Sequence, residues 1–490
     1  MNGTNTATDT IYDLLVVGTG AAGLTTATEF LHAADKGGWK PSIAVIDKAP
    51  VEESGGATRW SWVNLFVNQH GQVDPEVINR VIGGHPDVDD QYFRTLEAES
   101  GDTAQWMRTQ GVQIAYQNPG IAMESDYGAV VGGGQALLDA LMAQLRTRKG
   151  VEFLYSTEAL MIHQNGAGEV DGLTARTADG TEFTLRARTV VVACGGFEGS
   201  PEKLKQYVGD RGADIKPVVP GLRYNVGDGL RMITQVGGAT SGQFEKLHVQ
   251  LVDSRASKPD AGIFGVPYGI IVNNKGQRFI DEGSRTFEGL NAPLAWSVWR
   301  DHENEAYVIF DAQTDAIPAF SFLNQTNLEP VSATTIPGLA EALGLDPVAL
   351  HRTIEEFNAA TVAGPFDPAT KDGLRTQGLG IEKTNWARPL TTGPFIAYPV
   401  RTAGIFSFGG VRTDIDGRVI GTGGQPIPGL YAAGVTTGVW YTEYPGAMSI
   451  LRAVTFGRRA GRHAAYLAAT RTNAARTRTS PSTAAQSLPA

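Results

Sequence analysis

A glycine-rich turn near the N-terminus constrains the fold of this chain more than any other stretch. The apolar run Leu14–Val17 has the composition of a buried strand, and Gly18, Gly20 and Gly23 follow it at the spacing G-x-G-x-x-G. A segment of small residues typical of a closely packed helix comes next. In a dinucleotide-binding turn, the first glycine permits the tight turn, the second admits the pyrophosphate, and the third lets the helix approach the strand. The sequence therefore predicts a Rossmann-like unit whose helix N-terminus holds phosphates.

A second strand supports this interpretation. The run Ser42–Asp47 ends in an acidic residue, close to the usual separation of about 20 residues after the last glycine for a ribose-binding carboxylate. The loop Lys36–Pro41 accounts for the small excess in length. We therefore expect Asp47 to bind the ribose of an adenosine group.

Further strand–glycine–helix corners occur near Gly56, Gly196, Gly227 and Gly434. A nicotinamide dinucleotide needs one or two such corners, whereas FAD crosses a whole sheet edge and needs several. The predicted cofactor is therefore FAD, and the residues expected to contact it are Gly18, Gly20, Ala21, Ala22, Gly23, Asp47, Lys48, Ser54, Gly55, Gly56, Ala57, Thr58, Gly133, Ala193, Gly195, Gly196, Asn225, Asp228, Gly434, Ala447, Ser449 and Ile450.

Composition excludes several other classes of protein. A chain of 490 residues with 42% hydrophobic and 19% charged residues is globular, and its net charge of −10 gives no basic surface for nucleic acid. Apolar runs are too short for a membrane span, and the N-terminus has no features of a signal peptide, so we expect a cytoplasmic protein. The single cysteine, Cys194, excludes intrachain disulfides, and no Cys/His spacing suggests a metal site.

The pattern of elements changes along the chain and predicts an α/β fold with an insertion. We expect a disordered lead over residues 1–11 and an FAD-binding domain built from 12–242 and 394–470. Between these two parts, strands with hairpin turns and then helices indicate an α+β capping or substrate domain over 243–393. Residues 471–490 are rich in Thr, Ala, Ser and Arg, and we expect a disordered tail.

The motifs resemble those of the fumarate reductase/succinate dehydrogenase flavoprotein superfamily, in its soluble single-chain branch. That branch includes tricarballylate dehydrogenases, flavocytochrome fumarate reductases and 3-ketosteroid dehydrogenases. The resemblance implies an extended FAD under a capping domain, hydride transfer between flavin N5 and a carbon next to a carbonyl or carboxylate, and a separate electron acceptor. The motifs that carry it are VVGTGAAGL, IDKA, SGGAT, VVACGGFE, NVGDGL, GQRFIDEG, FGGVRTD, IPGLYAAG and MSILRAVTFGRRAG.

Departures from the superfamily pattern narrow the subclass. The histidine that binds FAD covalently in membrane-bound members would lie near Ala49, where this chain has none, so the resemblance implies non-covalent FAD. Phe406 stands where fumarate reductases have a substrate-binding histidine, and Thr286 stands in the register of their catalytic arginine, with Arg285 one place earlier. His248 matches the histidine of their Q-A-H-P-T stretch.

The segment Tyr444-Pro445-Gly446 resembles that of 3-ketosteroid dehydrogenases instead. There the tyrosine hydroxyl and a following backbone N–H, near Gly446 in this sequence, hold the substrate ketone. Such donors aimed at one carbonyl oxygen form an oxyanion site, which acidifies the α-hydrogen. The candidates for the base are Tyr441, Tyr398 and Arg285, and Arg59 is a further candidate for lining the substrate pocket.

The leading hypothesis is an FAD-dependent CH–CH dehydrogenase of a small cyclic ketone, such as an oxo-cyclohexanecarboxylate or a ketosteroid-like compound. Tyr444 would hold the ketone, and His248 or an arginine would hold a carboxylate. One alternative is a tricarballylate-like polycarboxylate dehydrogenase or a fumarate-type reductase. Another is a flavin-binding redox sensor without turnover. The expected partners are a small carbonyl or carboxylate substrate and the electron acceptor.

Overall fold

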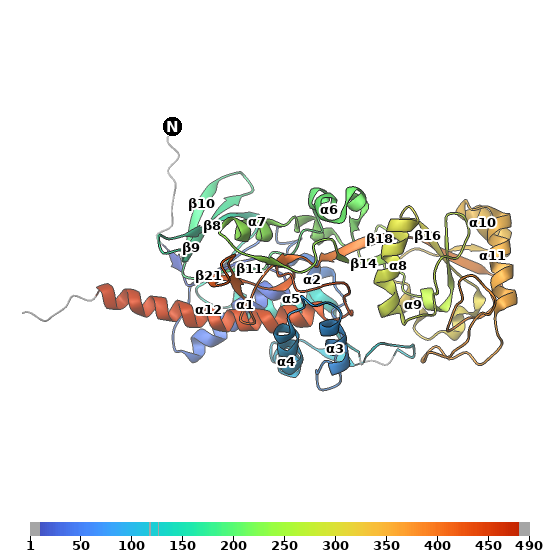
Figure 1. The fold of residues 1–490 in the computed structure, drawn as a ribbon. Coiled ribbons are helices and arrows are strands. Elements are labelled where there is room, and N and C mark those ends of the chain that lie inside the picture. Colours follow the sequence, from blue (N-terminus) through green and yellow to red (C-terminus); the bar gives the residue numbers. More distant parts are fainter. Residues whose placement is uncertain (1–9, 117–118, 126, 480–490) are drawn as a thin grey trace, which may run out of the picture.

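The computed structural model describes residues 10–116, 119–125 and 127–479. It consists of a larger body around a parallel sheet and a smaller body that carries α8 to α11, and the strands β14 and β18 run between them (Figure 1). Most of the predicted lead, residues 1–9, lies outside the described residues, but Ile11 already belongs to the strand β1 (Ile11–Tyr12). Among the described residues, no helix combines the length and apolar character that a membrane crossing requires.

The central sheet confirms the predicted α/β class and the Rossmann-like order. β2 (Leu14–Val17) pairs in parallel with β3 (Ile43–Ile46) on one side and with β11 (Val190–Val192) on the other. The sheet continues outward through β7 (Val151–Leu154) at one end, and through β21 (Pro426–Ala432) and β20 (Arg418–Ile420) at the other. The strand order reverses between β2 and β11, and doubly wound sheets bind ligands at the carboxyl ends of the strands on either side of such a point.

Two helices from opposite ends of the chain pack together over this sheet. α1 (Ala21–Lys36) lies along α12 (Ser449–Thr479), and the glycines of the FGRRAG stretch explain the close approach. A Cβ on Gly457 would lie 2.8 Å from the carbonyl oxygen of Ala22, and one on Gly461 would lie 2.5 Å from that of Thr26. The C-terminal segment of the chain thereby closes over the glycine turn that follows β2.

The predicted disordered tail begins too early in the chain. α12 continues past residue 470 to Thr479, and Arg471 attaches this part of the helix to the body of the protein. The Arg471 guanidinium donates to the carbonyl oxygens of Val170, at 3.2 Å, and Arg188, and it lies 3.4 Å from the Glu169 carboxylate. Residues 480–490 lie outside the described part of the chain.

The remaining elements of the larger body surround the sheet. A meander of β8 (Thr157–Gln164), β9 (Val170–Thr177) and β10 (Glu182–Ala187) pairs with β1, and β4 (Asn64–Leu65), β6 (Gly128–Val130) and β5 (Ile114–Tyr116) form a small antiparallel sheet. β13 (Thr240–Ser241) pairs with β19 (Gly410–Val411). The other helices are α2 (Gly56–Trp60), α3 (Pro75–Gly83), α4 (Asp90–Thr109), α5 (Gly133–Arg146), α6 (Pro201–Val208) and α7 (Asp228–Gln235).

The smaller body is built on the long strand β18 (Phe395–Ser407), as Figure 1 shows. β16 (Ala306–Phe310) and β17 (Val331–Ala333) pair with its first half, and β14 (Leu247–Asp253) pairs with its second half. β15 (Ile270–Asn273) extends the sheet beyond β16, and β12 (Lys216–Pro217) adds a short parallel pair to β18. The helices are α8 (Phe287–Asp301), α9 (Phe320–Leu323), α10 (Ile336–Leu343) and α11 (Pro347–Ala360). β14 and β18 thus run directly from this body toward the larger one.

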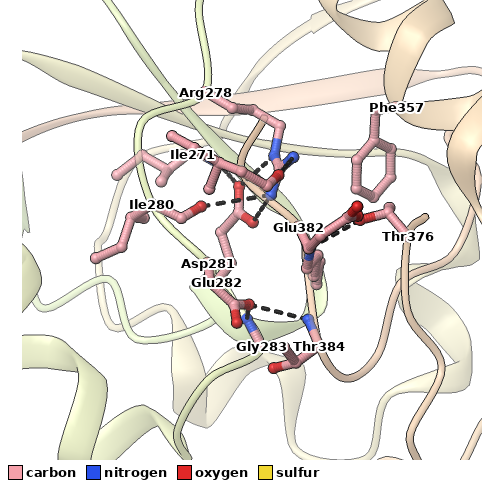
Figure 2. A network of polar contacts seen from close by, with 12 residues as sticks. Ile271, Arg278, Ile280, Asp281, Glu282, Gly283, Phe357, Thr376, Glu382 and Thr384 are labelled. Atoms are coloured by element: carbon pink, nitrogen blue, oxygen red, sulfur yellow. Dashed lines mark hydrogen bonds and ion pairs between the residues drawn. The ribbon is translucent and has the colours of Figure 1, made fainter. Parts of the chain in front are cut away.

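The segment GQRFIDEG, which contains Arg278 and Glu282, stabilises the loop that leads into α8. Figure 2 shows the buried ion pair between Arg278 and Glu282, whose closest atoms lie 2.6 Å apart, and Glu282 also accepts the backbone N–H of Ile271 at 3.1 Å. The neighbouring Asp281 accepts the backbone N–H groups of Gly283 and Thr384. This network holds the backbone in place just before Arg285 and Thr286, two of the predicted site residues.

Candidate active site

A long cavity follows the carboxyl ends of β2, β3 and β11 and continues to the junction of the two bodies. Its wall includes the glycine turn after β2, residues near the ends of β3 and β11, the start of α12, and side chains of β14 and β18. Of the residues predicted to contact FAD, those that line this cavity are Gly18, Gly20, Ala21, Ala22, Asp47, Lys48, Gly55, Gly56, Ala57, Thr58, Ala193, Gly195, Asn225, Asp228, Gly434, Ala447, Ser449 and Ile450.

Glycine is required for different reasons at the three glycine positions of the first turn. A Cβ on Gly18 would lie 2.3 Å from the carbonyl oxygen of Ala193, and one on Gly23 would lie 2.0 Å from that of Gly18. Close packing within the protein therefore requires both glycines. At Gly20 the nearest protein atom to such a Cβ is the hydroxyl oxygen of Thr58, at 3.6 Å, so the protein itself does not exclude a side chain there. The space beside Gly20 belongs to the cavity, which fits a ligand that approaches the backbone at this turn.

Asp47 is held in place at the end of the cavity that lies beside β3. Its carboxylate accepts the backbone N–H of Thr19 at 3.0 Å and that of Ala49 at 2.9 Å, and the Thr19 hydroxyl donates to it as well. Lys48 pairs with Asp228 across the cavity, with 2.6 Å between the charged atoms. The residues present thus fit an FAD whose adenosine lies at Asp47 and whose phosphates lie on the Gly20 turn.

Four predicted FAD contacts lie behind the cavity wall. Gly23 is a packing position, the hydroxyl of Ser54 donates to the carbonyl oxygen of Val51, and a Cβ on Gly133 would lie 2.9 Å from the carbonyl oxygen of Ser61. Gly196 is crowded by a serine and a glutamate side chain of the protein itself. These residues support the wall and do not line it.

Tyr444 stands at the other end of the cavity, where the two bodies meet. It is 6% exposed, and its ring packs against those of Phe406 and Trp440. Its hydroxyl oxygen accepts the backbone N–H groups of Met448 and Ser449, each at 2.8 Å. Burial raises the pKa of Tyr444, so the hydroxyl keeps its proton at neutral pH and can donate it to a ligand.

His248 lies against Tyr444 and Phe406. On β14 it pairs in register with Phe406 of β18, and its ring centroid lies 4.5 Å from that of Tyr444. Its Nδ1 atom is buried and has no hydrogen-bond partner. Burial lowers the pKa of His248 to about 3, so at neutral pH the imidazole is uncharged. It offers a ligand a hydrogen bond or a lone pair, but no positive charge.

The three candidates for the base lie away from this part of the cavity. Arg285 is half exposed and forms an ion pair with Glu443, at 2.9 Å. The hydroxyl oxygen of Tyr441 accepts the backbone N–H of Gly242 at 2.9 Å. Tyr398 is buried in the core of the smaller body.

Of the other residues predicted to contact substrate, only one lines the cavity. Phe406 lines the cavity, whereas Arg59, Thr286 and Gly446 do not. The Arg59 side chain donates to Gln135 at 2.9 Å and to backbone carbonyl oxygens of its own loop. Thr286 precedes the first residue of α8 and donates to Glu124 at 3.1 Å, and the backbone of Gly446 lies beside the ring of Phe66.

Sequence reasoning missed a buried carboxylate in the cavity wall. Glu198 is fully buried, and it accepts the Asn225 side-chain amide at 2.7 Å and the Ser407 backbone N–H at 3.3 Å. Burial raises the pKa of Glu198 to about 7. The motif VVACGGFE, which ends at this residue just after a predicted cofactor corner, was the signal that could have identified it.

The charge of the cavity is uneven. Of the described lysine and arginine residues, Lys48 alone lines the cavity, and it is paired with Asp228 at the end near Asp47. No described arginine or lysine lines the cavity beside Tyr444, although the buried Arg452 lies close enough behind the wall to act on Tyr444 electrostatically. The described residues also include no cluster of His, Cys, Asp and Glu that could hold a metal ion.

Sequence comparisons agree with the geometry. A family described as "FAD binding domain" matches residues 13–448. The vinyl phenol reductase of Lactiplantibacillus plantarum is 25% identical over 93% of this chain and 96% of its own. The fumarate reductase (cytochrome) of Shewanella frigidimarina is 26% identical over 93% of this chain and 77% of its own. The 4-oxocyclohex-2-ene-1-carboxylate 5-dehydrogenase of Sinomonas cyclohexanicum is 30% identical over 69% of this chain and 61% of its own.

Solved structures share the fold at lower identity. A 3-ketosteroid-Δ4-(5α)-dehydrogenase from Rhodococcus jostii, in complex with 4-androstene-3,17-dione, aligns with a TM-score of 0.69 and 23% identity over 94% of this chain and 98% of that one. A flavocytochrome c3 fumarate reductase in an open conformation aligns with a TM-score of 0.73 and 22% identity over 94% of this chain and 79% of that one. These likenesses extend over both bodies of the molecule.

Proposed function

We propose that this chain, which belongs to the FAD binding domain family, desaturates a neutral cyclic ketone. The family lies in the fumarate reductase/succinate dehydrogenase flavoprotein superfamily, and the chain is an FAD-dependent oxidoreductase of CH–CH bonds. The bond oxidised lies α,β to the carbonyl. The FAD is bound without a covalent link, since Ala49 stands at the position where the superfamily's attachment histidine would lie.

The observation that carries this proposal is the hydrogen bonding of Tyr444. Its hydroxyl oxygen accepts two backbone N–H groups at the start of α12, and the Ser449 side chain is a third hydrogen-bond partner that favours the ionised form. These partners occupy the lone pairs of the oxygen, which leaves the hydroxyl proton for a ligand. These N–H groups also polarise the hydroxyl, because the N-terminus of a helix carries partial positive charge. A ketone oxygen next to Tyr444 would thus meet a strengthened donor, which stabilises the negative charge that develops as the α-proton leaves.

The charge of the cavity supports a neutral substrate. A buried carboxylate without a cationic partner is strongly disfavoured. No described lysine or arginine lines the cavity beside Tyr444, since the buried Arg452 acts on Tyr444 from behind the wall, and His248 is uncharged at neutral pH. These observations argue against a polycarboxylate at this end of the cavity, although several relatives are fumarate reductases.

Each residue at the junction then has a defined task. Tyr444 donates to the carbonyl oxygen, and Phe406 presents an apolar surface to the ring of the substrate. The uncharged His248 packs beside Tyr444 and helps to position the substrate, because a pKa of about 3 makes its imidazole a poor base. Bound FAD supplies the acceptor for the hydride from the β-carbon.

The test is anaerobic mixing of the FAD-loaded enzyme with matched substrates. We expect neutral cyclic ketones to bleach the oxidised flavin absorbance, and 4-oxocyclohexanecarboxylate to do so more weakly. Succinate and tricarballylate should have no effect. Bleaching by the polycarboxylates alone would overturn the proposal, and fumarate-dependent reoxidation of the reduced enzyme would point to the reductase alternative.

A further inference from the structure

We propose that the wall of the cavity on the smaller body binds a hydroxyl group of the substrate, remote from its carbonyl, through Gln250, Asp260 and Gln325. This inference rests on the proposed ketone substrate and specifies its class further, as a hydroxylated cyclic ketone. All three residues line the cavity.

The position of Gln250 relates this site to Tyr444. His248 and Gln250 lie two residues apart on β14 and both line the cavity, although the pairing of β14 with β18 shifts register between His248 and Val249. The intervening Val249 points into the apolar core. Because a strand rises about 3.3 Å per residue, the site lies about 7 Å further along the cavity than His248. A substrate that spans both sites therefore needs its second polar group beyond the ring that carries the ketone.

Asp260 presents its carboxylate beside Gln250. The amide nitrogen of Gln250 donates to it at 2.6 Å, and Trp62 of the larger body hydrogen-bonds with the same carboxylate. The Asp260 backbone N–H donates to the carbonyl oxygen of Val218 at 3.1 Å. The backbone φ of Asp260 is +55°, a conformation that side-chain-bearing residues rarely adopt and that is often retained at ligand sites. The carboxylate is thus held in one place, with acceptor capacity left for a ligand.

Gln325 supplies the observation that points directly to a ligand. Its side chain is 8% exposed, and its amide nitrogen donates to the carbonyl oxygen of Phe322 at 3.2 Å. Its amide oxygen, Oε1, is buried and has no hydrogen-bond partner. Buried acceptors in folded proteins are almost always paired, because an unpaired one loses its bonds to water without compensation. A donor on a ligand in the cavity would satisfy this oxygen.

The missing ligand group is a neutral donor. Two residues with acceptor groups, Asp260 and Gln325, line the cavity here. The nearest cation, Lys258, does not line it, since its ammonium donates to the backbone oxygen of Gln325 at 3.0 Å. Burial also raises the pKa of Asp260, which weakens its attraction for a second cation. A hydroxyl fits these acceptors, whereas a carbonyl, an ether or a carboxylate offers them no proton.

The experiment uses four fused bicyclic ketones with the same skeleton. The ring remote from the ketone carries a hydroxyl, a methoxy group, an amino group or hydrogen, and kcat/KM is measured on the FAD-loaded enzyme. We expect the hydroxy ketone to exceed the unsubstituted and methoxy ketones by about tenfold or more, since a site built around a hydrogen bond rejects analogues that cannot form it. Equal rates for these three ketones would overturn the hydroxyl site and leave the ketone proposal intact. A preference for the amino ketone would overturn it as well, because the site would then bind a cation and not a hydroxyl. If none of the four reduces the flavin, the proposed function itself fails.

Variants test whether the named residues form this site. Gln325→Leu and Asp260→Asn should each reduce the ratio of the rates for the hydroxy and unsubstituted ketones toward one. A ratio measured within one variant is insensitive to a general loss of activity. Glu329→Gln is the matched control, because it removes one negative charge from an exposed position of the smaller body outside the cavity, and the ratio should stay at the wild-type value. An unchanged ratio in both cavity variants would overturn the assignment.

Discussion

The ring centroids of His248 and Tyr444 lie 4.5 Å apart, although His248 belongs to β14 and Tyr444 to the segment just before α12. The contact joins a strand that runs out to the smaller body with the end of the chain that closes over the larger one. A group that donates a hydrogen bond thereby lies next to an uncharged imidazole whose Nδ1 has no partner. This end of the cavity is therefore formed by residues of both bodies together.

Replacing Tyr444 by Phe should lower kcat by about 10²–10³, because one donor to the developing negative charge is lost. The ring and its packing against His248 and Phe406 remain, so the FAD content should stay at the wild-type level. The N–H groups of Met448 and Ser449 lose their acceptor, so we expect a small loss of thermal stability as well. Steady-state kinetics on a ketone that bleaches the flavin would measure this effect.

The control for this variant is Tyr398→Phe, which removes a buried tyrosine hydroxyl away from the cavity. It should retain nearly full activity. If Tyr444→Phe keeps more than about a third of the wild-type kcat/KM, less than ~1 kcal/mol of transition-state stabilisation is lost and the ketone assignment fails. The polycarboxylate alternative predicts the opposite ranking, with the main loss in His248→Ala or Arg285→Ala.

The parts of the site that local motifs encode could be predicted from the sequence. The turn Gly18–Gly23 and Asp47 carry their spacing with them, and Tyr444 stands in a recognisable tripeptide. Arg285 was misplaced because it lies just before α8, where its side chain finds Glu443 at the surface. Gln325 could not be predicted, because a loop far from any motif brings it to the cavity, through a backbone bond to Gly262 at 2.8 Å. Long-range contacts of this kind leave no periodic signal in the sequence.

The buried carboxyl of Glu198 should make the protein less stable as the pH rises. Its folded-state pKa of about 7 lies above the unfolded value of 4.5, so the folded state retains a proton that the unfolded state has lost between these values. This contribution to stability is complete below about pH 4.5 and is lost as the pH rises through about 7. We expect Glu198→Gln to gain melting temperature relative to wild type between pH 5 and pH 8, since the amide has no charge to bury.

The measured quantity is the difference in melting temperature between Glu198→Gln and wild type at each pH. Groups that titrate in both proteins, such as His248, cancel in this difference. Glu202→Gln, an exposed change on the neighbouring helix α6, is the control and should follow the wild-type curve. Parallel melting curves for wild type and Glu198→Gln across this pH range would contradict the raised pKa.

The flavin should be released when the protein is denatured. No histidine lies near Ala49, so the chain offers no side chain of the kind that attaches FAD in membrane-bound members of the superfamily. Acid precipitation should therefore leave the yellow chromophore in the supernatant, where its spectrum identifies it. Flavin that stays with the pellet after washing would show a covalent link.

Gly20 should be required for FAD binding and not for folding. Its φ of −69° and ψ of 178° are open to any residue, and a Cβ would meet no protein atom closer than 3.6 Å. Gly20→Val should therefore purify without flavin, while its melting temperature matches that of the wild-type apoprotein. Gly166→Val, at an exposed glycine with free space around it, is the control and should retain FAD. A yellow Gly20→Val protein would exclude this turn as the pyrophosphate site.

The last turns of α12 should contribute to stability, contrary to the expectation from composition. The Arg471 guanidinium donates hydrogen bonds to the backbone carbonyl oxygens of Val170 and Arg188. A chain that ends before Arg471 would leave these two oxygens without this donor. Hydrogen bonds of a charged donor contribute about 1.5–3 kcal/mol, and the partial exposure of Arg471 places the expected loss near the lower end. A chain that ends at Thr470, and the Arg471→Ala variant of the full chain, should both unfold at lower denaturant concentration than wild type. A chain that ends at Thr479 retains Arg471 and is the control, which should unfold like wild type. If the chain that ends at Thr470 also unfolds like wild type, the contacts of Arg471 contribute nothing to stability.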